Sequence, residues 1–335
     1  MSSRVTSLDV ARRAGVSQSA VSRVFTPGAS ASASTGAKVR AAASDLGYRP
    51  NVLARSMVTG QSRIIGLVVA YFDNYFYPDV LEKLSHRLQA RGYHVLIFMA
   101  EQSAGPVDSV LERILDYQVD GIVMASTAIS SDLAARCRSV GVPVVLFNRT
   151  QDDASLSAVT SDNFEGGRQA AVKLLEGGAR RIGYIAGWEG ASTQRDREAG
   201  FCDGLGRGPD LRAVGDFQME RAREAARHLF DRDNPPDALF VCNDHMAYAA
   251  MDVMRSELGI RIPEDVSVIG YDDAAPSAWP TYDLSTIRQP ADAMIDQTIE
   301  TLLTAIENPG AAPRQAQIPG QFIQRGSSRQ AKVKA

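Results

Sequence analysis

Apolar residues show two different spacings along the chain, and the spacing changes near residue 64. Before that point they recur three and four positions apart within short stretches, which is typical of amphipathic helices. After it, short continuous apolar runs alternate with longer amphipathic stretches. Such runs predict strands buried on both faces, and therefore parallel, doubly wound sheets with helices between the strands. We expect an all-α N-terminal segment followed by an α/β body.

Two series of apolar runs in the body predict two similar lobes. The expected strands are 64–70, 94–100, 121–126 and 142–148 in the first series, and 181–187, 238–243 and 266–272 in the second. Doubly wound sheets bind ligands beyond the carboxyl ends of their strands. Aromatic, amide, carboxylate and guanidinium side chains follow these ends. Aromatic faces stack on sugar rings and the polar groups bond hydroxyls, so the set suits a polyhydroxylated ligand.

Three short helices are expected within the first fifty residues. Ser7 is a candidate N-cap of the first helix, and Gly15 ends it. Ser17 caps the second helix. Ser32 or Ser34 opens the third, which ends at Gly47. Two short helices joined through a glycine-containing turn predict a helix-turn-helix.

The exposed face of the second helix carries Gln18, Ser19, Ser22 and Arg23. These are short hydrogen-bonding groups and one arginine, near the N-terminal end of a helix that would enter a major groove. Glutamine can read adenine, and arginine can read guanine or hold phosphate. A small helical bundle with a polar face remains the alternative interpretation.

Charge is distributed unevenly between the two parts. Residues 1–63 contain nine basic and two acidic residues, a net charge of +7, whereas the rest contains 27 basic and 37 acidic residues, a net charge of −10. A basic headpiece on an acidic body indicates that one end approaches a polyanion.

A continuous motif makes the headpiece more specific. Residues 9–24 read DVARRAGVSQSAVSRV and residues 46–51 read LGYRPN. Both stretches resemble the headpiece of the lactose/galactose repressor (LacI/GalR) family of bacterial transcription regulators. Two features depart from the family pattern: Gly36 replaces a common arginine at the start of the third helix, and the preceding loop is rich in alanine and serine.

The resemblance continues through the body, in segments such as VDGIVM, RIGYIAG, REAGF and PEDVSVIGYDD. It implies a periplasmic-binding-protein-like effector domain with a ligand between two lobes. Arg197 is the strongest single candidate because its R-x-x-G-F setting matches best. Rim packing is the alternative for Trp188, and an exposed helix face for Arg195. The strand ends and the resemblance together predict effector contacts from Asn74, Phe76, Tyr77, Ser126, Trp188, Thr193, Arg195, Arg197, Asn243, Asp272 and Gln289.

Residues 50–62 resemble the family's hinge helix, which orders when two copies pair in the minor groove. Met57 stands where relatives carry a leucine that wedges into a base step. A plain linker is the alternative. The resemblance, with the exposed face of the second helix, predicts DNA contacts from Ser17, Gln18, Ser19, Ser22, Arg23, Asn51, Ala54, Arg55 and Met57.

The expected domains are a headpiece over 1–49, a hinge helix over 50–62 and an effector-binding and dimerisation domain over 63–335. Within the last, lobe 1 is expected over 63–161 and 291–320, and lobe 2 over 162–290 and 321–329. The C-terminal tail lacks leucine heptads, so we expect a dimer without a tetramerising coil. A two-fold dimer would match a pseudo-palindromic operator.

Other classes of protein fit less well. The N-terminus lacks the apolar core of a secretory signal, and no apolar run is long enough to span a membrane. This disfavours an extracytoplasmic sugar-binding protein and predicts a cytoplasmic location, on the nucleoid when operator-bound. The first strand is not followed by G-x-G-x-x-G, so a Rossmann-like enzyme is disfavoured. We expect no metal and no cofactor, although zinc bound by the three cysteines and a histidine is conceivable.

The sequence therefore predicts a repressor that binds its operator as a dimer. Its effector is expected to be a carbohydrate or a sugar acid bound between the lobes. Whether that effector induces or co-represses stays open.

Overall fold

The structure is a computed structural model that describes residues 5–26, 29–49, 61–70, 72–99, 104–125, 130–151 and 155–330. The chain divides into two compact units, one ending at Arg63 and one beginning at Ile64. Nearly all of the predicted hinge helix, including Asn51, Ala54, Arg55 and Met57, lies outside the described residues, so those predictions stay predictions.

The first unit contains three helices: α1 (Ser7–Ala14), α2 (Gln18–Phe25) and α3 (Ala33–Leu46). Val10, Val21 and Val39, one from each helix, are buried together with small alanine side chains. The prediction that Ser7 caps α1 is wrong. Thr6 is the N-cap, because its hydroxyl accepts from the backbone N–H of Asp9 while the Asp9 carboxylate accepts from the N–H of Thr6.

The predicted ends of the other two headpiece helices agree with the structure. Ser17 caps α2, and Ser32, rather than Ser34, caps α3. Gly15 and Gly47 adopt the left-handed conformation that ends α1 and α3.

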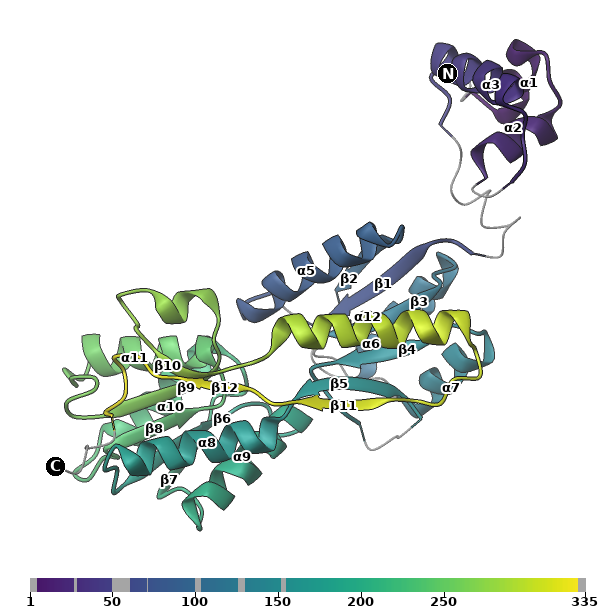
Figure 1. Ribbon diagram of the computed structural model, residues 1–335. Coiled ribbons are helices and arrows are strands. Elements are labelled where there is room, and N and C mark those ends of the chain that lie inside the picture. The colour runs from purple at the N-terminus through teal and green to yellow at the C-terminus, as the bar shows by residue number, and fades with distance from the viewer. Residues whose placement is uncertain are drawn as a thin grey trace. The chain divides into compact units, whose positions relative to one another are not determined.

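The second unit contains two six-stranded sheets, so the predicted two-lobed α/β fold is confirmed (Figure 1). Lobe 1 is the part built on the first sheet, in the order β11-β5-β4-β3-β1-β2, and lobe 2 the part built on the second, in the order β12-β10-β9-β8-β6-β7. The first sheet consists of β1 (Ile64–Val69), β2 (His94–Met99), β3 (Gly121–Ala125), β4 (Val144–Phe147), β5 (Ser157–Ser161) and β11 (Gln315–Ile318). The second consists of β6 (Ile182–Ala186), β7 (Leu211–Val214), β8 (Ala238–Val241), β9 (Ser267–Asp272), β10 (Ser285–Arg288) and β12 (Gln321–Ile323).

Helices cover both faces of each sheet. Alternate residues of β1 face opposite cores: Leu67 packs with α5 and α12, whereas Val68 packs with α6 and α7. Lobe 1 carries α5 (Phe76–Ala90), α6 (Ala104–Asp116), α7 (Ser131–Ser139) and α12 (Ala291–Glu307). Lobe 2 carries α8 (Asn163–Glu176), α9 (Ser192–Leu205), α10 (Met219–Phe230), α11 (Asp244–Ser256) and the 3-10 turn η1 (Ala275–Ala278). No helix in the described part of the chain is long and apolar enough to cross a membrane.

The chain passes between the lobes three times. It leaves lobe 1 after β5, returns after β10 to form α12 and β11, and ends in lobe 2 with β12, as the yellow segment of Figure 1 shows. Three connecting segments of the chain join the lobes. The carboxyl ends of β1, β4, β6, β8 and β9 face the space between the lobes.

Two expectations about the strands are wrong. The strand β2 is not buried on both faces, because it lies at the sheet edge and leaves Ile97 and Met99 about half exposed. The second sheet is not wholly parallel, because β12 pairs antiparallel with β10. The strands β5, β7, β10, β11 and β12 carry polar residues and therefore lack the apolar runs by which the other strands were predicted.

Candidate functional site

Asp272, at the carboxyl end of β9, lies at the centre of the polar residues between the lobes. Its φ of 126° is strained for a residue with a side chain. One carboxylate oxygen accepts from Asn74 Nδ2 of lobe 1 at 3.0 Å, and the other accepts from Gln289 Nε2 at 2.7 Å. Burial raises the pKa of Asp272, and the nearby guanidinium of Arg197 opposes this rise. The carboxylate, which belongs to lobe 2, thus bonds to lobe 1 through Asn74 and to the segment between β10 and α12 through Gln289.

Arg197 projects from α9 and is 2% exposed. Its Nε donates to Asn163 Oδ1 at 2.8 Å and its Nη1 to the carbonyl of Cys242 at 2.6 Å. Its Nη2 lies 3.7 Å from the carboxylate of Asp272, and its guanidinium stacks 3.6 Å from the centre of the Tyr271 ring. Each nitrogen of this guanidinium therefore has a neighbour within lobe 2.

Asn243 and His245 form a second fixed group in lobe 2. Asn243 caps α11 by accepting from the N–H of Met246, and its amide lies 3.0 Å from His245 Nδ1. Burial lowers the pKa of His245 to about 4, so the ring is neutral at pH 7. A neutral ring that accepts from Asn243 at Nδ1 donates from Nε2 to the Phe217 carbonyl, at 2.9 Å.

Asp244 is a fully buried carboxyl beside this group. It accepts from the hydroxyls of Ser277 and Thr286, both at 2.7 Å, and from the N–H of Ala274 at 3.0 Å. Burial, reinforced by the charge of Asp272, raises the pKa of Asp244 to about 7. The three donors stabilise the carboxylate only in part, because none of them carries a positive charge.

Lobe 1 contributes Asn148 and Arg149, which follow β4. Asn148 has a φ of 60°, and its Nδ2 donates to Tyr77 Oη at 3.1 Å. Arg149 is 3% exposed, and its guanidinium lies 5.3 Å from the ring centre of Trp188 in lobe 2. Within the described ranges, Asn148 Oδ1 and Arg149 Nε have no hydrogen-bond partner, and Arg149 has no ion pair.

Two cavities adjoin Asp272. The smaller, of about 10 Å³, is large enough for about one water molecule. It is lined by Asn74, Tyr77, Asn148, Thr193, Arg197, Phe217, Asn243 and Asp272. The larger, of about 630 Å³, lies between the N-terminal ends of α5 and α12 and the ends of β9 and β10. Its volume is in the range of small-molecule sites.

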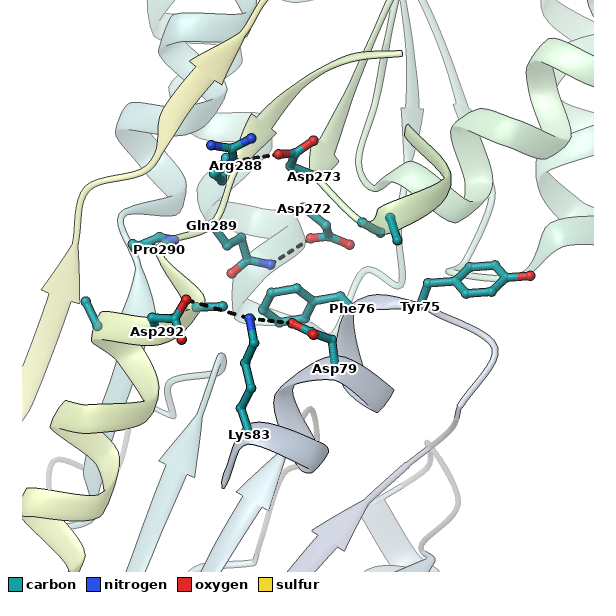
Figure 2. Close-up of a pocket in the computed structure, with 14 residues that line it drawn as sticks. Tyr75, Phe76, Asp79, Lys83, Asp272, Asp273, Arg288, Gln289, Pro290 and Asp292 are labelled. Carbon is teal, nitrogen blue, oxygen red and sulfur yellow. Dashed lines mark hydrogen bonds and ion pairs between the residues drawn. The ribbon is translucent and has the colours of Figure 1, made fainter. Parts of the chain in front are cut away.

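Figure 2 shows the larger cavity. Lys83 lies between Asp79 and Asp292, at 3.0 Å and 3.6 Å, and the amide of Gln289 points at Asp272. Gln289 is 3% exposed, and its Oε1 has no partner among the described residues. This cavity therefore offers a buried acceptor beside the carboxylate that both cavities share.

The structure brings most of the predicted effector residues together, but around two cavities rather than one. Asn74, Tyr77, Thr193, Arg197 and Asn243 line the smaller, Phe76 and Gln289 line the larger, and Asp272 lines both. Trp188 is half-buried at the lobe boundary. Arg195 is exposed on α9 and lines neither cavity. Ser126 lies outside the described residues.

Sequence reasoning missed Phe217 and did not count Asn148 among the contacts. Phe217 follows β7, a strand with no apolar run, so the loop at its carboxyl end was not located. Asn148 is the last residue of the predicted strand 142–148 and directly follows the observed β4, and that position was the available signal.

The predicted DNA-contacting residues of the first unit are all exposed. They are Ser17, Gln18, Ser19, Ser22 and Arg23. Gln18 Nε2 donates to Ser7 Oγ at 2.9 Å, which ties the start of α2 to α1, and Ser17 caps α2. Among the described side chains, those of Ser22 and Arg23 make no hydrogen bond or ion pair, so both can bind a ligand outside the unit.

No group of three potential metal-binding side chains occurs in the part of the chain that the structure describes. The three cysteines are free thiols.

Comparisons with known proteins follow the same division of the chain. Residues 6–51 match the model for bacterial regulatory proteins of the lacI family, and residues 171–328 match that for a periplasmic-binding-protein-like domain. The ribose operon repressor of Escherichia coli (strain K12) is 30% identical over 96% of this chain and 98% of its own. A lac repressor dimer bound to operator and an anti-inducer superposes with a TM-score of 0.86, at 26% identity over 97% of this chain and 99% of that one. A complex of the regulator CelR with cellobiose superposes with a TM-score of 0.73, at 30% identity over 97% and 100%.

Proposed function

Because the chain belongs to the lacI family of bacterial regulatory proteins, we propose that it is an operator-binding transcriptional repressor controlled by a small molecule. The observation that carries the proposal is the union, in one chain, of a basic helix-turn-helix and a two-lobed unit whose polar side chains converge on Asp272. It is a regulator rather than an enzyme. It acts in the cytoplasm, on the nucleoid when operator-bound.

The helix α2 supplies the base contacts of this proposal. Gln18, Ser22 and Arg23 are exposed on one short helix, which has the size and polarity that a major groove accepts. Arg23 supplies a guanine or phosphate contact. In this proposal Asn51, Ala54, Arg55 and Met57 add hinge contacts in the minor groove. Met57→Ala should therefore weaken operator binding and leave effector binding almost unchanged.

The effector of this proposal is a carbohydrate or a carboxylated or phosphorylated derivative, held beside Asp272. The named relatives support this class, since they include a ribose operon repressor and a cellobiose-bound regulator. Asp272, Asn243 and Gln289 supply hydrogen bonds to hydroxyls, and Arg149, which has no ion pair among the described residues, supplies a positive charge for an acid. Since the smaller cavity has room for about one water, a sugar enters it only when the lobes or side chains move apart.

We propose a dimer as the operator-binding species. Large apolar side chains are exposed on lobe 1 at Ile97 and Met99, on the open edge β2, and on lobe 2 at Trp279. A second copy would cover such surfaces in a two-fold assembly, and the structurally similar lac repressor is a dimer when bound to operator. The effector changes how the lobes close, and this shifts the population of dimers that fit both half-sites.

The test combines a ligand screen with an operator assay. Purified protein is screened by thermal shift against pentoses, hexoses and disaccharides, each beside its acid and its phosphate. A promoter fragment from the gene's own neighbourhood is then titrated at several salt concentrations. We expect specific binding that weakens steeply with salt, and one compound class that changes it. Absence of specific binding to any such fragment would refute the repressor function.

A further inference from the structure

Three side chains of lobe 2 form a continuous series of hydrogen bonds next to the turn that carries Trp188. Gln194 on α9 is fully buried, and its Oε1 accepts from the N–H of Gly187 at 2.6 Å and from Tyr184 Oη at 2.9 Å. Its Nε2 donates to Glu198 at 2.6 Å. None of these residues was expected from the sequence to matter for the effector.

This series of hydrogen bonds continues through Arg212 on β7. Its Nε and Nη2 both donate to the carboxylate of Glu198, at 2.6 and 2.8 Å, and Nη2 also donates to Glu189 at 2.7 Å. The hydrogen bonds to Glu198, followed by those to Glu189, raise the pKa of Arg212. Gly187 and Glu189 are the neighbours of Trp188 in sequence, so the series of hydrogen bonds holds the turn on both sides of that residue.

The chemistry of each position is dictated by its neighbours. The N–H of Gly187 can only donate, so the amide oxygen of Gln194 must face it. The amide nitrogen then faces Glu198, whose carboxylate can only accept and is itself held by Arg212. A carboxylate at position 194 would repel Glu198, and an apolar side chain would leave a buried N–H without a partner.

The turn itself holds the indole tightly. The carbonyl of Trp188 accepts from the N–H of Ala191 at 3.0 Å, and a Cβ on Gly190 would lie within 2.5 Å of the indole ring. Lobe 1 also contacts the indole, because the guanidinium of Arg149 lies 5.3 Å from the centre of the Trp188 ring. Thr193 and Arg197, close to Gln194 on α9, line the smaller cavity.

We propose that Gln194, Glu198 and Arg212 form a positioning relay that holds Trp188 at the boundary between the lobes and thereby sets effector affinity. The effect of the relay on effector affinity rests on the proposed function. The effect of the relay on the position of Trp188 does not. Gln194 is a positioning residue, because it acts through Trp188 and through the first turn of α9.

The first test measures Trp188 directly. The chain has two tryptophans, so Trp279→Phe leaves Trp188 as the single tryptophan, whose emission is excited selectively. In that background Gln194→Glu places two carboxylates together, and we expect Trp188 emission to shift and its quenching by acrylamide to rise about twofold or more. Gln194→Glu combined with Glu198→Gln restores one carboxylate, one amide and the native net charge, and should return quenching to the Trp279→Phe value.

A matched control breaks a similar bidentate pair elsewhere. Arg227 on α10 donates to both oxygens of Glu257 at 2.7 and 2.8 Å, as Arg212 does to Glu198. Arg212→Gln should reproduce the change in Trp188 quenching, whereas Arg227→Gln should leave it unaltered. If Gln194→Glu does not fold, Arg212→Gln carries the test. Unchanged quenching in the folded variants, or an equal change in Arg227→Gln, would overturn the relay.

The second test links the relay to binding. D-ribose, D-ribose 5-phosphate and any compound positive in the thermal-shift screen are titrated by calorimetry. We expect about a tenfold weaker Kd in Gln194→Glu, equivalent to about 1.4 kcal/mol, and recovery in the double variant. Altered quenching with an unchanged Kd would overturn the link to affinity. If no compound binds even the native protein, the effector proposal fails while the quenching result still decides the placement of Trp188.

Discussion

The two sides of the candidate site differ in how completely their polar atoms are satisfied. On the lobe 2 side, Arg197, Asn243 and His245 make hydrogen bonds mainly within their own lobe. On the lobe 1 side, Asn148 and Arg149 retain polar atoms without partners among the described residues. Lobe 2 therefore provides a scaffold that exists before any ligand binds, and lobe 1 provides groups that a ligand can complete.

The largest expected effect tests the scaffold. Arg197→Met should destabilise the protein by about 3–5 kcal/mol, because it leaves the buried Asp272 carboxylate without its counter-charge. Arg149→Met, the matched change in lobe 1, should cost less than about 1 kcal/mol because it breaks no ion pair among the described residues. Urea denaturation followed by circular dichroism measures both. Similar losses for the two arginines would remove the distinction between the lobes.

The next effect concerns the ligand. Arg149→Gln should weaken binding of a carboxylated or phosphorylated effector by about 10–100-fold, since hydrogen bonds to charged groups contribute about 1.5–3 kcal/mol. Binding of the neutral parent sugar should change little. Calorimetry with the matched pair of ligands measures the difference. The control is Arg195→Gln, on the exposed face of α9. A larger loss in that control would assign the anion contact to Arg195.

A smaller effect depends on pH. Burial raises the pKa of Asp244 to about 7, above its ordinary value of 3.8, so the folded protein binds the extra proton between these two values. Its contribution to stability is therefore present below about pH 4 and is lost as pH rises through 7, by at most about 1.4 kcal/mol per pH unit. Asp244→Asn should remove this part of the pH dependence. Denaturation of both proteins at pH 5, 6, 7 and 8 measures it, and parallel curves would show that Asp244 is not its origin.

The smallest effect separates backbone from side chain in lobe 1. Asn148 has a φ of 60°, which glycine adopts freely and alanine does not. Asn148→Ala should therefore be about 1 kcal/mol less stable than Asn148→Gly, while both lose the same bond to Tyr77. Urea denaturation of the pair gives the difference. Equal stabilities would indicate that the side-chain bond, and not the conformation, determines the cost of replacing Asn148.

The sequence predicted the fold well because its strongest signals are local. The headpiece helices have caps and glycine stops, and the buried strands are apolar throughout. Strands such as β7 and β10 were missed because sheet pairing, not composition, makes them strands. Tertiary context overrides local preference most at sheet edges and crossovers.

The candidate site was predictable only in part. Residues at the carboxyl ends of apolar strands, such as Asn243 and Asp272, could be found by position. Gln194 and Arg212 could not, because their roles arise from contacts between α9 and β7 that no spacing records. The division of the predicted residues between two cavities also depends on how far the lobes close, which is a property of packing rather than of sequence pattern.

The three passages between the lobes also determine the order in which the protein can be completed on the ribosome. The helices α1, α2 and α3 are finished within the first fifty residues, and β1 to β5 of lobe 1 are made by residue 161. One face of that sheet is nevertheless covered only in part, by α5, until α12 is made, because Met294, Ile295, Ile299 and Leu302 complete its core. Lobe 2 has five of its six strands once β10 is made, but its last strand, β12, follows α12 and β11 of lobe 1, so both lobes are completed only in the last part of the chain. A message truncated before residue 291 therefore yields a DNA-binding segment joined in sequence to two unfinished lobes. Such a product would be removed by quality control rather than act as an unregulated repressor.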